Sequence, residues 1–272
     1  MVWSQVINEK TLDGFMICQK TYAYTINLRF INRNCVECGI CEILCPKTAI
    51  KLVKDNKIQI DENKCVRCGI CSYLCMFNAL QIKYVSFDNI KKKEVEMKKI
   101  GGLPNLKSKI TINYKKCNLC QTCEKVCPKE AISINENQLE IKDELCILCG
   151  WCSSTCPEGA ITVDKLFQGS LLLKKNIDDN NEIQELISIC PSKCLRYKDM
   201  DSNRIRNVKT KKILGKDSDN ISWLNEFCIF CGACVKLKPE FIIEFKRTKI
   251  NSDVPFLENK IWVEIKKKLL NR

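Results

Sequence analysis

Residues 35–46 read CVECGICEILCP, which places four cysteines at the spacing C-x2-C-x2-C-x3-C with a proline after the last of them. The same spacing recurs as CVRCGICSYLCM (65–76), CNLCQTCEKVCP (117–128) and CILCGWCSSTCP (146–157). The first two blocks begin 30 residues apart and the last two begin 29 apart. The four blocks therefore form two pairs, and this repeat organises the chain.

The cysteine spacing indicates iron–sulfur chemistry. Thiolates are soft anionic donors, and runs of this spacing that end in proline are typical of [4Fe–4S] ligation. Structural zinc sites instead use separated C-x2-C pairs. The chain has 22 cysteines and no histidine, which excludes Cys2His2 zinc, Rieske centres and His-dependent triads. We therefore favour iron–sulfur clusters over zinc or a disulfide scaffold.

The pairing of the blocks predicts which cysteines share a cluster. In two-cluster ferredoxins the first three cysteines of a block bind one cluster and the fourth binds the other. The expected sets are Cys35, Cys38, Cys41 and Cys75; Cys65, Cys68, Cys71 and Cys45; Cys117, Cys120, Cys123 and Cys156; and Cys146, Cys149, Cys152 and Cys127.

A fifth set is expected from two incomplete blocks. Residues 228–239 read CIFCGACVKLKP, with Lys238 where the fourth cysteine would stand, and CPSKCL (190–195) resembles the end of a block. The three ligand positions before Cys190 hold Asn180, Ile183 and Leu186. Loss of one cluster from a crossed pair removes three ligands from one block and one from the other, which is this pattern. The expected fifth set is Cys228, Cys231, Cys234 and Cys190.

Two cysteines remain outside these five sets, Cys18 and Cys194. Free cysteine commonly behaves as a small buried hydrophobe, which is our interpretation of both. Replacement of Cys190 by Cys194 as a ligand is the alternative, and Pro191 favours Cys190.

The segments between the cysteines predict the fold class. Residues 49–65 and 131–146 alternate apolar and polar side chains around a polar turn, which predicts two short strands in each. The segment from the third to the fourth cysteine, such as 41–46, predicts a short helix. Strand, helix, hairpin, helix and strand in each pair give an α+β unit built around metal rather than around a broad apolar core.

These blocks resemble the bacterial-type 2[4Fe–4S] ferredoxin domain in tandem. Over about residues 25–245 the chain resembles the polyferredoxins of methanogenic archaea. The resemblance implies pseudo-twofold ferredoxin-like dicluster domains. It also implies an electron-carrying subunit beside a hydrogenase, a formylmethanofuran dehydrogenase or another oxidoreductase.

The expected domain boundaries follow the blocks. They are an N-terminal extension (1–24), dicluster domains (25–88 and 107–168) joined by a linker (89–106), a degenerate single-cluster domain (169–245) and a C-terminal helical tail (246–272). In the tail, Phe256, Ile261, Trp262, Ile265 and Leu269 recur at helical spacing. This face either packs on its own domain or docks a partner.

The net charge of +13 by itself would suggest a nucleic-acid-binding protein. The negative charge of the expected clusters changes this interpretation. A [4Fe–4S] core with four thiolates carries about −2, so five would contribute about −10 and leave about +3. We expect no nucleic-acid partner. No apolar run approaches the roughly 18 residues of a membrane span, and no signal peptide is apparent. We expect a cytoplasmic protein. Peripheral association with a membrane complex is compatible with this expectation.

We expect five [4Fe–4S] clusters in an electron-transfer protein that has no catalytic residues of its own. No Walker loop, dinucleotide fingerprint or acid–base pair indicates a substrate site. One alternative is a subunit that contributes directly to catalysis with a neighbouring flavin or metal cofactor. Another is an architectural iron–sulfur protein that binds nucleic acid.

Overall fold

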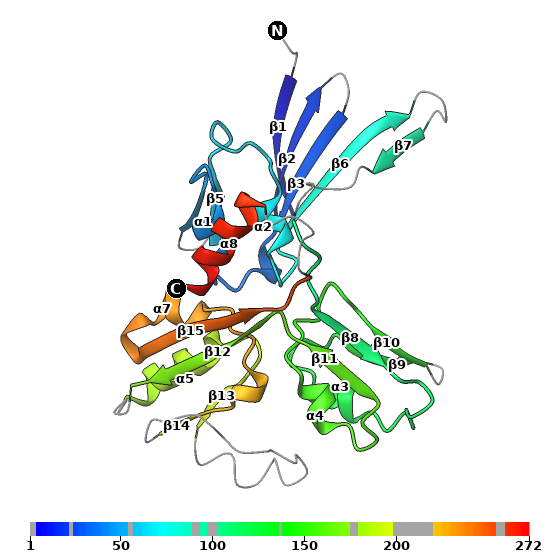
Figure 1. The fold of residues 1–272 in the computed structure, drawn as a ribbon, viewed down its shortest axis with the longest axis vertical. Coiled ribbons are helices and arrows are strands. Elements are labelled where there is room, and N and C mark those ends of the chain that lie inside the picture. Colours follow the sequence, from blue (N-terminus) through cyan, green and yellow to red (C-terminus); the bar gives the residue numbers. More distant parts are fainter. Residues whose placement is uncertain are drawn as a thin grey trace. The chain divides into compact units, whose positions relative to one another are not determined.

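The computed structural model describes residues 4–21, 24–53, 57–88, 93–96, 103–135, 138–174, 179–197, 220–253 and 259–271. The chain divides into two compact units, Met1–Leu103 and Pro104–Arg272. Their elements are labelled in Figure 1.

The first unit is built on an antiparallel five-stranded sheet. Its strand order is β1 (Ser4–Thr11), β2 (Gly14–Thr21), β3 (Tyr24–Ile31), β6 (Leu80–Asp88) and β7 (Lys93–Glu96). The residues expected as an N-terminal extension thus supply a hairpin that pairs onto β3. Gly14 is required in this hairpin, because its φ is +130° and an added Cβ would lie 2.0 Å from the Phe30 carbonyl oxygen.

The first unit shows the predicted order of strand, helix, hairpin, helix and strand. The elements are β3, α1 (Ile40–Leu44), β4 (Ile50–Val53), β5 (Lys57–Ile60), α2 (Ile70–Tyr73) and β6. β4 pairs antiparallel with β5, as the alternation of residues 49–65 predicted. Pairing of β3 with β6 closes the order, and the 3-10 helix η1 (Asn32–Asn34) leads into the first cysteine loop.

The second unit contains the same order twice. Its first copy is β8 (Lys109–Ile112), α3 (Thr122–Val126), β9 (Ile132–Asn135), β10 (Gln138–Ile141), α4 (Trp151–Thr155) and β11 (Ile161–Asp164). Strand β8 pairs with β11 and β9 with β10. The predicted fold class, an α+β architecture of short antiparallel hairpins and short helices, is confirmed.

The second copy covers the incomplete cysteine blocks. Its elements are β12 (Phe167–Leu173), α5 (Asn180–Ile189), β13 (Leu195–Tyr197), β14 (Ile221–Trp223), η3 (Asn225–Phe227), α7 (Ala233–Leu237), η4 (Pro239–Phe241) and β15 (Ile242–Ile250). Strand β12 pairs with β15, and β13 with β14. The topology of a complete pair is therefore kept although four ligand positions are lost.

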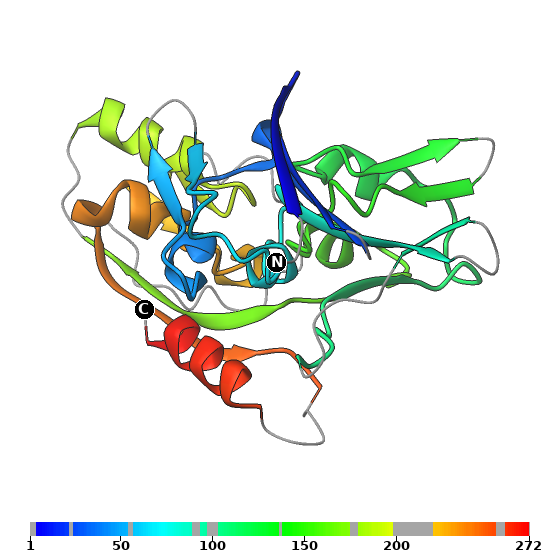
Figure 2. The ribbon, with the colours of Figure 1, turned by 90° about the horizontal axis from the view of Figure 1, so that it is seen from above.

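The C-terminal helix α8 (Lys260–Leu270) lies along β15 (Figure 2). Trp262, Ile265 and Leu269 are buried, whereas Ile261 is 47% exposed, so only part of the predicted apolar stripe faces inward. Phe256 lies outside the described residues. The helix therefore packs within its own unit.

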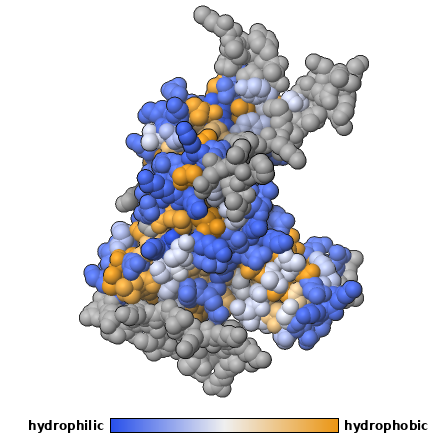
Figure 3. All heavy atoms as spheres, viewed as in Figure 1, coloured by the Kyte–Doolittle hydropathy of each residue, from blue (hydrophilic) through white to orange (hydrophobic). Residues whose placement is uncertain are grey.

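Hydrophilic and hydrophobic residues are interspersed over the described part of the face drawn in Figure 3. Among the described residues, none of the helices has the length and apolar character needed to span a membrane.

Candidate iron–sulfur centres

The first three cysteines of each block lie in a loop with the same unusual backbone. The residues before and after the second cysteine both have φ between 50° and 90°. These residues are Glu37 and Gly39, Arg67 and Gly69, Leu119 and Gln121, Leu148 and Gly150, and Phe230 and Gly232. Non-glycine residues adopt this left-handed region at a cost in free energy. Its recurrence in all five loops therefore indicates that the arrangement of the cysteines requires this backbone conformation. In the fifth loop this backbone conformation lets Phe230 N donate a hydrogen bond to Cys228 Sγ at 3.4 Å.

The fourth cysteine of each block begins a second repeated turn. The third residue after it again has positive φ, at Thr48, Asn78, Glu130, Gly159 and Lys193. Lys193 N donates to Cys190 O at 3.1 Å, as Thr48 N does to Cys45 O at 3.2 Å. Cys190 therefore occupies the same turn as the fourth cysteines of the complete blocks.

The turn also places an amide against the ligand sulfur. Ala49 N donates to Cys45 Sγ at 3.2 Å, and Ala131 and Ala160 donate to Cys127 Sγ and Cys156 Sγ at 3.3 Å each. Amide hydrogen bonds to sulfur stabilise the thiolate and tune iron–sulfur potentials.

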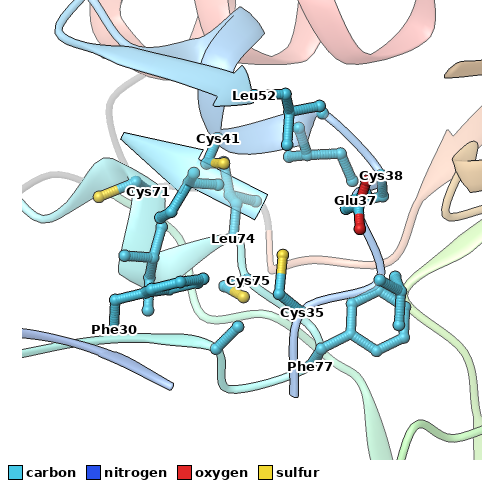
Figure 4. Close-up of a pocket in the computed structure, with 16 residues that line it drawn as sticks. Phe30, Cys35, Glu37, Cys38, Cys41, Leu52, Cys71, Leu74, Cys75 and Phe77 are labelled. Atoms are coloured by element: carbon cyan, nitrogen blue, oxygen red, sulfur yellow. The ribbon is translucent and has the colours of Figure 1, made fainter. Parts of the chain in front are cut away.

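Four cavities gather the cysteines of the complete blocks in the crossed sets. Figure 4 shows the first, where Cys35, Cys38 and Cys41 meet Cys75 from the second block. The second cavity is lined by Cys65, Cys68, Cys71 and Cys45. The third is lined by Cys117, Cys120, Cys123 and Cys156, and the fourth by Cys146, Cys149, Cys152 and Cys127. Cys71 lines both cavities of the first pair, so the two sites of a pair adjoin at this cysteine.

The fifth group brings together cysteines from the two incomplete blocks. Cys190 Sγ lies 3.4 Å from Cys194 Sγ, and Cys194 also shares a side-chain hydrogen bond with Cys228. Cys234 interacts electrostatically with Cys190 and Cys228. Cys231 is buried in the same loop as Cys228 and Cys234.

Cys194 occupies the position that alanine holds after the other fourth cysteines. It is buried, as is Cys18, which agrees with the interpretation of both as small buried residues. Its thiol nevertheless contacts two predicted ligands. Hydrogen bonding to Cys194 lowers the pKa of Cys190, and hydrogen bonding to Cys190 and Cys228 raises the pKa of Cys194. The choice between Cys190 and Cys194 as ligand stays a prediction.

Burial and mutual repulsion disfavour the thiolate form of several other cysteines in these groups. Burial, followed by the charge of neighbouring cysteines, raises the pKa of Cys71 and Cys152 to about 12. Burial likewise raises the pKa of Cys234 to about 12 and of Cys149 to about 11. A bound cation reverses this balance, because metal ligands bind as thiolates and release their protons.

The surroundings of Arg67 test whether an anionic group fits the second cavity. Its side chain is only 7% exposed and lines the second cavity. Its Nη1 donates to Cys65 O at 3.2 Å, whereas Nε and Nη2 have no hydrogen-bond partner among the described residues. Buried guanidinium groups are normally satisfied. A four-thiolate iron–sulfur cluster is anionic, so the second cavity fits such a group.

Within the described part of the chain, no group of three or more His, Cys, Asp or Glu residues forms a site for a single metal ion. The thiol groups instead surround cavities with apolar walls, such as Phe30, Leu52 and Phe77 in the first.

Comparisons with known proteins agree with this geometry. A family described as "4Fe-4S dicluster domain" matches residues 116–161, and a second family of the same description matches 34–79 and 64–131. No curated protein matches the sequence. A chain of the formate dehydrogenase–heterodisulfide reductase–formylmethanofuran dehydrogenase complex from Methanospirillum hungatei matches with a TM-score of 0.74. The identity is 24%, and the match covers 99% of this chain and 92% of that chain.

Residues 34–161 therefore consist of 4Fe–4S dicluster ferredoxin domains, and the chain is an electron-transfer iron–sulfur protein. The dicluster ferredoxin domains that the cysteine blocks predicted are thus confirmed for this segment.

Sequence reasoning missed side chains that lie beside the ligands. Arg67 carried a readable signal, because it is the basic residue at a loop position held elsewhere by Glu37, Leu119, Leu148 and Phe230. Lys165 carried none, since nothing in its local sequence indicates that its ammonium donates to the Cys228 carbonyl oxygen, 3.2 Å away.

Proposed function

We propose that this protein carries five [4Fe–4S] clusters, one in each crossed cysteine set, and relays low-potential electrons between redox proteins. The observation that supports a fifth cluster is the repeated backbone conformation of the cysteine loops. Residues 228–232 and 190–193 reproduce the positive-φ pattern of the four complete blocks. A loop without a ligand role has no evident reason to keep this costly conformation.

Each cluster, when bound, supplies a centre that accepts and releases one electron. The protein's own residues hold the ligands, exclude water and set the electrostatic environment. Ile40, Ile70, Trp151 and Ala233 directly follow the positive-φ residue of their loops and are buried beside the cysteines. Apolar side chains at these positions keep water away from the sulfurs, which tunes potential.

We propose that the partners are subunits of an oxidoreductase complex, such as a hydrogenase or formylmethanofuran dehydrogenase. The similar chain from Methanospirillum hungatei supports this, because its complex is named for formate dehydrogenase, heterodisulfide reductase and formylmethanofuran dehydrogenase. On this proposal the chain works in the cytoplasm and transforms no substrate alone. We also propose that the residues of site five belong to a degenerate third ferredoxin domain, for which the sequence predicted residues 169–245.

The test is the iron, acid-labile sulfide and zinc content of protein purified without oxygen. Five clusters give about twenty iron and twenty sulfide per chain, with EPR signals after dithionite reduction. About sixteen iron would show that the fifth site is empty. Zinc in place of iron would contradict the electron-transfer proposal.

Paired substitutions separate the two candidate ligands of the fifth site. Cys190→Ser should lower the content by about four iron per chain, because it removes the predicted fourth thiolate. Cys194→Ala should keep the full content, because it restores the residue found at the same place in the complete blocks. The reverse result would assign the ligand role to Cys194. Circular dichroism on both variants checks that the fold is retained.

A further inference from the structure

The ligand loops of the fourth and fifth sites are joined by an aromatic stack inside the second unit. Trp151 lies between the ligands Cys149 and Cys152, and Phe227 directly precedes Cys228. Their ring centroids are 3.5 Å apart with an interplanar angle of 7°. Trp151 is 4% exposed and Phe227 is fully buried. The two rings thus link a ligand loop of one site directly to a ligand loop of the next.

Polar contacts also hold the same junction together. Trp151 Nε1 donates to Ser192 O at 2.8 Å, two residues after Cys190. Lys165 Nζ donates to Cys228 O at 3.2 Å and also to the Glu226 carbonyl oxygen. The junction therefore contacts both chain segments that supply the ligands of the fifth site.

The Trp151 ring has a further contact, with the guanidinium carbon of Arg196 4.4 Å from the ring centroid. Aromatic stacks and cation–π contacts each stabilise a ring position beyond the effect of burial. The position of the Trp151 ring is thus determined by several independent contacts.

No other loop in the chain carries this combination of residues. The positions equivalent to Trp151 hold Ile40, Ile70, Thr122 and Ala233, and those equivalent to Phe227 hold Asn34, Lys64, Lys116 and Leu145. The fifth site also lacks a second site inside its own domain, because the ligand positions of that site were lost. The Trp151–Phe227 stack instead connects the fifth site to the cysteines of the fourth site.

We infer that Trp151 and Phe227 are positioning residues that hold the fourth and fifth sites at a fixed separation for electron transfer. This rests on the proposed function. Sites three and four adjoin within their pair, where Cys123 and Cys152 share one buried cluster of side chains. The order of sites in the second unit is then three, four and five, with the stack as the connection that replaces the lost pairing.

The experiment uses the full-length protein with its clusters, purified without oxygen and fully reduced. The variants are Trp151→Ala, Phe227→Ala and Trp151→Phe, with Trp262→Ala as a matched control that removes a buried tryptophan from α8. Iron per chain and the microwave-power saturation of the EPR signal are measured for each. Magnetic relaxation between neighbouring reduced centres falls steeply with their separation, so saturation reports the spacing of sites without any partner enzyme.

Trp151→Ala and Phe227→Ala should lower the half-saturation power of part of the signal several-fold, whereas Trp151→Phe and Trp262→Ala should match the original protein. Loss of about four iron in both alanine variants, with full iron in Trp151→Phe, would also support the inference. Unchanged iron and saturation in Trp151→Ala would overturn it, as would a Trp151→Phe variant that behaves like Trp151→Ala. About sixteen iron in the unsubstituted protein would instead refute the fifth cluster of the proposed function.

Discussion

Two residues at equivalent positions give neighbouring sites opposite electrostatic environments. Arg67 and Glu37 each precede the second cysteine of their loop, at φ values of 52° and 56°. Arg67 lines the second cavity and Glu37 the first. Figure 4 shows Glu37 beside Cys38 at the first cavity. Because reduction adds negative charge, a nearby cation favours the reduced state and a nearby carboxylate disfavours it.

Arg67→Gln should therefore lower the reduction potential of the second site. A decrease on the order of 60 mV would correspond to a tenfold change in the one-electron equilibrium. Glu37→Gln is the matched variant and should raise the potential of the first site by a smaller amount, since Glu37 is less buried. An EPR-monitored redox titration measures both. Equal potentials in Arg67→Gln and the original protein would show that this guanidinium does not act on the cluster.

Arg247 shows how a single buried cation connects the fifth site to the C-terminal helix. It is 1% exposed and donates from Nε and Nη2 to the carbonyl oxygens of Phe230 and Cys231, both at 2.8 Å. Its Nη1 donates to the carbonyl oxygen of Leu269 at 3.1 Å. Three carbonyl groups of the ligand loop and α8 thus depend on one planar guanidinium, a geometry that lysine does not provide.

At the scale of elements, helix α5 takes the place of the lost ligand loop. Ile183 and Leu186 stand at positions where the complete blocks have cysteine, and both are fully buried. Lys238, at the fourth lost position, forms an ion pair with Glu185 of α5 at 2.5 Å. Apolar side chains and an ion pair thus occupy the positions from which a sixth cluster would be held.

Lys238→Cys should therefore leave the iron content unchanged. A single restored thiol does not recreate a site whose other three positions are Asn180, Ile183 and Leu186. The cost in stability should be small, because the ion pair is partly exposed. Iron analysis and chemical denaturation measure the two effects. An increase of about four iron would show that the sixth site had only been missing one ligand.

The elements of the fold were largely predictable, because cysteine spacing and strand alternation are local signals. The hairpins at 49–65 and 131–146 are observed as β4–β5 and β9–β10. The hairpin β13–β14 was not foreseen, since its two strands of three residues are separated by residues 198–220. The Trp151–Phe227 stack joins residues 76 apart in sequence, and no periodicity reports a contact of that kind.

At the scale of the whole molecule, the two units differ in how much of their buried core consists of residues other than cysteine. The first unit contains a sheet whose core includes Ile17, Leu28, Phe30, Leu80 and Ile82. In the segment β8–β11 of the second unit, one buried cluster has five residues, of which two are the predicted ligands Cys123 and Cys152. The three others are Ile132, Leu139 and Ile161, so this cluster contains few apolar side chains besides the predicted ligands.

Removal of iron should therefore unfold the β8–β11 segment before the sheet of the first unit. Without metal, this segment retains few apolar contacts and gains buried thiols, such as Cys152, whose pKa burial raises to about 12. Metal binding and folding are coupled in domains of this kind, because the ligand energy contributes directly to folding. Hydrogen exchange measured by mass spectrometry, during anaerobic chelation with a thiol reductant present, follows each segment. Peptides from β8, β9 and β10 should lose protection first, while those from β2, β3 and β6 keep it. Simultaneous loss of protection in both units would show that the sheet also depends on the clusters, and that its apolar core is insufficient alone.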